Sequence, residues 1–108
     1  MNTISNVSVS PDVIRDVARI TTLATPGVLS LVDQPTVISI VPREAFRGVD
    51  VMLNDQNAQI SLHLIAADDA ALMELGKDIQ KNVCEAVEEI CGVNVSAVNV
   101  SFEDVRKA

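Results

Sequence analysis

The chain has 108 residues, of which 48% are hydrophobic and 21% charged, a composition typical of a folded globular domain rather than a disordered segment. We expect one domain over residues 1–108, able to bury roughly two-thirds of its unfolded surface. The net charge of −7 disfavours binding to nucleic acid or to anionic lipid, because both repel an acidic surface.

No basic region followed by an apolar run opens the chain, so no signal peptide is predicted. The longest apolar runs have four residues, whereas a membrane-spanning helix needs about 20. We therefore expect a cytoplasmic protein that does not insert into the membrane directly. Any association with a membrane would require a partner.

The first predicted helix begins at Ser10-Pro11-Asp12, where serine can cap the helix, proline suits its first position and the acid faces its positive end. Thr25-Pro26-Gly27 ends it. The spacing of its apolar residues predicts a buried stripe made of Val13, Val17, Ile20 and Ala24.

Residues 28–41 contain two short apolar runs on either side of Asp33–Thr36, a pattern consistent with a β-hairpin. Pro35 and Pro42 bracket the second run and favour an edge strand or a loop there. This run is apolar on both faces, and a strand covered on one side only would alternate with polar residues. We therefore predict a self-association interface at Val37, Ile38, Ile40 and Val41.

Two further strands are predicted around the turn Asn54–Asn57, whose residues tolerate the required backbone angles. Their inward residues are Val49, Val51 and Leu53 on the first strand, and Ile60, Leu62 and Leu64 on the second. A last strand alternates Val98, Val100 and Phe102 with polar residues. Val93 and Val95 are out of phase with it, which indicates a bulge or a late start. The charged tail Asp104–Ala108 is expected to fray.

The longest amphipathic segment is Asp69–Gly92. Asp69 is predicted to cap the helix, and Gly92 to end it in the left-handed conformation. Gly76 lies in the apolar stripe and could let another backbone approach closely. The stripe comprises Leu72, Leu75, Ile79, Val83, Ala86, Val87 and Ile90.

Together these elements predict an α+β fold with two layers, in which two helices pack on one face of a small mixed sheet. The core order is helix-strand-strand-helix-strand, with room for extra short strands early in the chain. The open face of the sheet would carry Asp50, Met52, Ser61, His63, Asn99 and Ser101.

That open face raises the question of a small hydrolase built on His63, Ser61, Ser101 and Asp50. A nucleophilic serine needs a strained turn or a helix start beside an oxyanion hole, whereas these residues fall in strand interiors. A solvated polar face is the better interpretation. We predict no catalytic residues, and the hydrolase stays as the weakest alternative.

Two cysteines, Cys84 and Cys91, lie seven residues apart on the predicted long helix, about 10 Å along its axis. This exceeds the roughly 7 Å Cα separation that a disulfide allows, so both are expected to be reduced thiols. Glu85 and Glu88 should raise the pKa of Cys84 and make it a poor nucleophile. With a single histidine on the other side of the sheet, no tetrahedral metal set forms, and no cofactor is predicted.

The same element order is found in KH-like nucleic-acid-binding modules, which grip the backbone with a GxxG loop. The glycines are Gly27, Gly48, Gly76 and Gly92, and no pair has that spacing. Phe46 and Phe102 are the only aromatic residues, which leaves little for base stacking. We favour no nucleic-acid binding and keep this module as the alternative.

The chain resembles the alkaline shock protein family of bacteria over most of its length. The similar segments are Val9-Ser10, Val13–Ala24, Pro26–Val28, Gly48–Val51, Ile60–Ile65, Ile79–Val83, Ala86–Glu89, Gly92-Val93 and Val98–Val100. The sequence departs from the family pattern in Asp33–Arg47 and at Ala67-Asp68-Asp69.

The resemblance implies a non-enzymatic protein of the envelope stress response or of envelope homeostasis. It implies a cytoplasmic homo-oligomer that binds other proteins, in some cases held near the membrane by a small anchor protein. The family provides no catalytic residues, so none is assigned.

Overall fold

The computed structural model describes residues 7–32 and 48–108, which form two helices and four strands. In chain order these are α1 (Pro11–Ala24), β1 (Val28–Leu31), β2 (Val49–Asn54), β3 (Asn57–Ala67), α2 (Leu72–Cys91) and β4 (Asn94–Arg106). The predicted order is confirmed, and β1 is an additional short strand early in the chain. β1 is the first apolar run of the hairpin predicted over residues 28–41, whereas its turn and second run, residues 33–41, lie outside the described residues.

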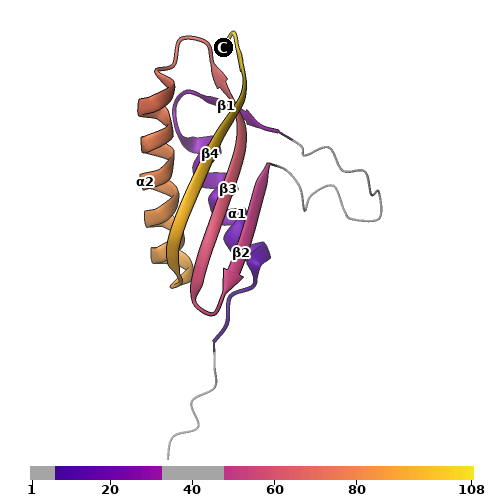
Figure 1. Cartoon of the computed structure of the whole chain (residues 1–108), viewed down its shortest axis with the longest axis vertical. Coiled ribbons are helices and arrows are strands. Elements are labelled where there is room, and N and C mark those ends of the chain that lie inside the picture. The colour runs from indigo at the N-terminus through magenta and orange to yellow at the C-terminus, as the bar shows by residue number, and fades with distance from the viewer. Residues whose placement is uncertain (1–6, 33–47) are drawn as a thin grey trace, which may run out of the picture.

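β3 is the central strand of the sheet (Figure 1). β4 pairs with it in parallel along one edge. β2 and β1 pair with it antiparallel and lie end to end on the other edge, opposite residues 57–62 and 64–66. They meet at His63, whose carbonyl accepts from the Val32 N–H and whose N–H donates to the Gly48 carbonyl, both at 2.8 Å. The sheet is therefore mixed, as predicted.

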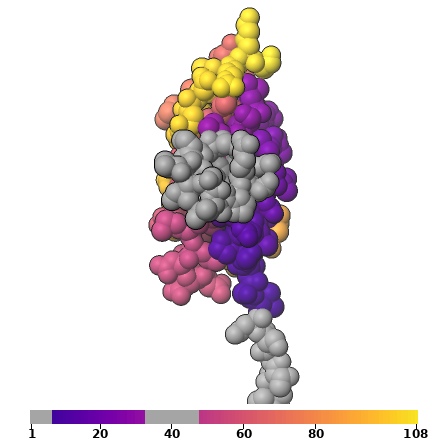
Figure 2. Space-filling view, turned by 90° about the vertical axis from the view of Figure 1, so that its right-hand side faces the viewer, coloured from indigo at the N-terminus to yellow at the C-terminus, as the bar shows by residue number. Residues whose placement is uncertain are grey.

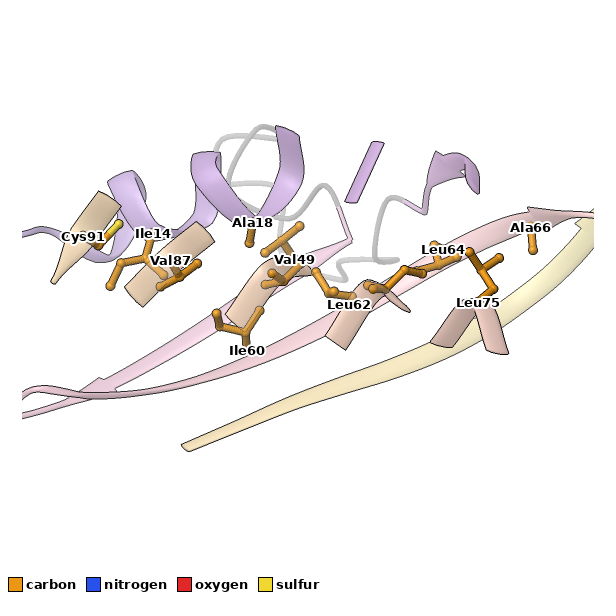
Figure 3. Close-up of a cluster of buried hydrophobic side chains, with 12 residues drawn as sticks. Ile14, Ala18, Val49, Ile60, Leu62, Leu64, Ala66, Leu75, Val87 and Cys91 are labelled. Carbon is orange, nitrogen blue, oxygen red and sulfur yellow. The ribbon is translucent and has the colours of Figure 1, made fainter. Parts of the chain in front are cut away.

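Both helices cover the same face of this sheet, and the apolar core lies between the two layers (Figure 3). The two-layer α+β fold is thus confirmed. The core comprises Ile14 and Ala18 of α1, Leu75, Ile79, Val83, Val87 and Cys91 of α2, and Val49, Ile60, Leu62, Leu64 and Ala66 of the strands.

The predicted buried face of α1 is wrong. Val13 is 47% exposed and Ile20 60% exposed, whereas Ile14, Ala18 and Thr22 are fully buried. The distance between packed elements depends on the side chains at the contact, and the small residues Ala18 and Thr22 lie where α1 packs on the core. Val13 and Ile20 consequently lie on an exposed flank of α1, and Val17 packs only partly against the core.

The predicted face of α2 is correct from Leu75 to Val87 and wrong at Ile90, which is 68% exposed. Gly92 ends the helix in the left-handed region as predicted, with φ 70°. Asp69 does not cap the helix, because the chain first makes a turn in which the Ala70 N–H donates to the Ala67 carbonyl at 3.1 Å. The N-cap position therefore falls on Ala71, which cannot donate or accept through its side chain.

Gly76 is approached by a side chain rather than by another backbone. A Cβ atom at this position would lie 3.6 Å from the Phe102 ring, which is an ordinary contact. A methyl group would therefore fit beside Phe102, and the packing of this ring does not require glycine at position 76.

β4 has two bulges along its pairing with β3. The first falls between Val95 and Ala97, where the change of phase predicted one. The second falls between Phe102 and Asp104 and was not predicted. The strand continues to Arg106, whose carbonyl accepts from the Asp68 N–H at 2.8 Å. The expected fraying of the tail from Asp104 onward is therefore wrong as far as Arg106.

α2 lies beside β4 (Figure 1), and two of its side chains bond to the outer edge of that strand. Gln80 Nε2 donates to the Val98 carbonyl at 2.9 Å. The Val95 N–H donates to Glu88 Oε2 at 3.1 Å. Because these groups belong to an edge strand, their partners on α2 protect it from pairing with another strand.

Candidate functional site

The open face of the sheet brings together side chains from three strands. Asp50 comes from β2, His63 from the middle of β3, and Ser101 lies directly opposite His63 on β4. Glu103 is the extra residue of the second β4 bulge. The sequence predicted that Asp50, His63 and Ser101 share a face, and the structure confirms it.

His63 lies between two carboxylates. Its Nδ1 atom is 3.4 Å from Glu103 Oε2, and its Nε2 atom is 3.7 Å from Asp50 Oδ2. Ser101 Oγ donates to the same Glu103 oxygen. The hydrogen bonds from Ser101 and His63 hold the pKa of Glu103 below its usual value. The sequence alone gave no signal for this contact, because it depends on where β4 bulges.

These distances do not make a catalytic triad. Within residues 7–32 and 48–108, the hydroxyl of Ser101 bonds to Glu103 and that of Ser61 accepts from Asn99 Nδ2 at 3.5 Å, so neither serine bonds to the imidazole. A serine nucleophile needs its base within hydrogen-bonding distance. The arrangement fits a polar, solvated sheet face better than a hydrolytic site.

The same row of side chains also fails as a metal centre. The two carboxylates lie at opposite nitrogens of the ring, so they cannot share one ion with a single histidine nitrogen. In the part of the chain that the structure describes, no cluster of three or more His, Cys, Asp or Glu residues could hold a metal.

Both cysteines are free thiols in the structure; Cys84 is half-buried and Cys91 is buried. Burial raises the pKa of Cys84, and the carboxylates of Glu88 and Glu85 raise it further. Burial alone raises the pKa of Cys91. Neither thiol is therefore activated at neutral pH.

We expect slow alkylation of Cys84 by iodoacetamide in the folded protein at pH 7, and fast alkylation in denaturant. A raised thiol pKa leaves little thiolate at neutral pH, so the native rate should rise steeply as the pH is increased toward 10. Mass spectrometry after timed quenching would follow the reaction. Glu88→Gln should accelerate it more than Glu85→Gln, because Glu88 has the larger effect on this pKa. Rapid native labelling at pH 7 would contradict the assignment.

The predicted interface residues Val37, Ile38, Ile40 and Val41 lie outside the described residues. The structure does fix the two ends of their segment. Val32 and Gly48 both bond to His63, at the junction of β1 and β2.

α1 carries a second apolar surface. The sequence predicted that its residues belong to the core, but most of them are exposed. We call Val13, Val17, Ile20 and Ala24 the α1 seam. Val17 is half-buried and the other three are exposed, and Leu23 beside them is 43% exposed. The spacing of the seam was visible in the sequence, but not the direction in which it faces.

The fold and these surfaces define a two-layer α+β domain built on a mixed sheet. The chain belongs to the alkaline shock protein 23 family: the family's sequence profile, described as having a cell envelope-related function, matches residues 1–107. The family resemblance seen in the sequence is thereby confirmed. No curated protein matches the chain.

Solved structures with a similar fold include several of the MamM CTD. A variant in its zinc form has 12% sequence identity and a TM-score of 0.63, over 90% of this chain and 87% of that one. A second variant has 10% identity and a TM-score of 0.55, over 92% of this chain and 100% of that one. A nickel form has 10% identity and a TM-score of 0.53, over 90% of this chain and 98% of that one. At these identities the similarity concerns the fold alone.

Neither described helix is long and apolar enough to cross a membrane.

Proposed function

We propose that this protein serves the cell envelope-related function of its family by self-association and protein binding rather than by catalysis. The observation that supports this most directly is the set of apolar side chains on the surface of α1, where Val13, Ile20 and Leu23 are all more than 40% exposed. Apolar surface left in water by a soluble domain commonly marks a contact with another protein.

The acidic composition bears on the choice of partner. A net charge of −7 opposes direct adsorption to anionic lipid. We therefore propose that the protein is cytoplasmic and reaches the envelope through a partner, such as a small membrane-anchor protein, and that it works as a homo-oligomer. Salt-dependent binding of RNA would instead favour the KH-like alternative, and substrate turnover lost in His63→Ala would favour the hydrolase.

The segment Thr36–Val41 provides the first test of self-association. Replacing Ile38 and Ile40 with Lys should yield a smaller species in sedimentation velocity while the far-UV circular dichroism of the folded protein is kept, because lysine opposes pairing of apolar edges. A control with Gln34→Lys and Gln56→Lys adds the same charge outside the apolar run and should sediment like the wild type.

Loss of the folded signal in the Ile38/Ile40 variant would show that these residues belong to the core of one copy. A wild type that remains monomeric at about 1 mM would remove self-association from the proposed function.

A further inference from the structure

The α1 seam has the spacing of a helix–helix interface. Its residues Val13, Val17, Ile20 and Ala24 follow one another at intervals of 4, 3 and 4 residues. This is the heptad pattern in which two helices interlock side chains at a shallow crossing angle. The opposite side of α1 already packs on the core through Ile14, Ala18 and Thr22. Val17 is half-buried and packs against the core, whereas Val13, Ile20 and Ala24 are exposed. These exposed residues can meet a helix from outside the described fold, and Figure 2 shows the indigo part of α1 at the surface beside the strands.

Charge distinguishes α1 from the other helix. The charges of its four ionisable residues sum to zero. Asp12 pairs with Arg15, and Asp16 pairs with Arg19 at 3.5 Å. On α2, five acids face two lysines, which leaves a net charge of −3 (2 − 5). Copies of a chain with a net charge of −7 repel one another on average. α1 is a surface where two copies can approach without net repulsion.

The other surfaces are less suited to a second copy. The outer edge of β4 is partly occupied by Gln80 and Glu88. The open sheet face carries the polar row around His63. Exposed apolar residues on α2, such as Met73 and Ile90, lie 17 positions apart and form no stripe.

We propose that the α1 seams of two copies pack against each other about a two-fold axis and form a dimer. The proposal rests on self-association as the proposed function and names its surface. A two-fold contact uses the same patch on both copies, which a neutral helix with an apolar seam satisfies. The seam extends over only about two heptads. The area that two such seams bury is below the roughly 800 Å² per partner of a stable interface. The dimer is therefore weak and depends on concentration.

The test compares two variants that keep the net charge. Val13→Gln with Ile20→Gln removes the two large exposed apolar side chains of the seam. Met73→Gln with Ile90→Gln removes two exposed apolar groups of α2 and is the matched control. Sedimentation velocity from about 10 µM to 1 mM should show dimerisation at least about tenfold weaker in the seam variant and unchanged in the control. Wild-type amide chemical shifts should change on dilution mainly in residues 13–24.

The outcomes separate the two proposals. A wild type that dimerises as strongly as the seam variant, or dilution shifts located away from α1, would overturn the seam while self-association stands. An equal loss in the control would also overturn it. A wild type that is monomeric throughout the concentration range would overturn both.

Discussion

Val83→Asp should leave little folded protein. Val83 is fully buried at the centre of the α2 face, among the apolar residues of β3 and α1. Burial of an unpaired carboxylate costs several kcal/mol even after local relaxation. That cost is comparable with the whole stability of a small domain, about 5–15 kcal/mol. Far-UV circular dichroism and urea unfolding would measure the loss.

The matched control is Glu85→Ala, two positions further along the same helix and on its exposed side. Alanine is the better helix former, and surface changes of this kind alter stability by no more than about 0.5 kcal/mol. Similar losses of stability in the two variants would mean that the buried face of α2 is assigned wrongly.

The elements with regular hydrophobic periods could be predicted from the sequence. Along β2 and β3, strict alternation fixed which residues face the helices, and Val49, Ile60 and Leu62 are all buried as expected. On α2, the stripe is long enough that an error at one end, at Ile90, leaves the rest unchanged. Periodicity over many residues averages out local exceptions.

The orientation of α1 could not be predicted, because the helix has two candidate faces. The larger side chains form the seam, and burial of Thr22 looks unfavourable since its hydroxyl has no hydrogen-bond partner among the described residues. The structure nevertheless buries Thr22 with Ile14 and Ala18. The packing of α1 against the other elements decides the face, and this packing is a tertiary property that the period of one helix does not contain.

The open sheet face was predicted in part. Alternation placed Asp50, His63 and Ser101 together, but the contact between His63 and Glu103 depends on a bulge in β4 relative to β3. A bulge moves every later side chain by one position. The self-association interface at Val37, Ile38, Ile40 and Val41 remains a prediction. The exposed seam on α1 is a second candidate surface for self-association.

Gly48→Ala should destabilise the protein by about 3 kcal/mol or more. Gly48 has φ 72°, and a Cβ atom there would lie 2.6 Å from the His63 carbonyl oxygen and 2.7 Å from that of Val32. Both neighbours are backbone atoms of residues at the junction, where the His63 carbonyl accepts from the Val32 N–H and the His63 N–H donates to the Gly48 carbonyl. Relief of the clash therefore requires breaking at least one of these bonds, in addition to the strain of a left-handed alanine.

Gly92→Ala separates these two contributions. Gly92 has nearly the same φ, 70°, but a Cβ atom there would meet nothing within 4 Å. This variant should lose only the conformational cost of about 1–2 kcal/mol. Urea unfolding of both variants gives the difference, which measures how firmly the junction at His63 is held. Equal losses would show that Val32 and Gly48 can separate freely, and that the ends of the segment 33–47 are not fixed to β3 as the structure has them.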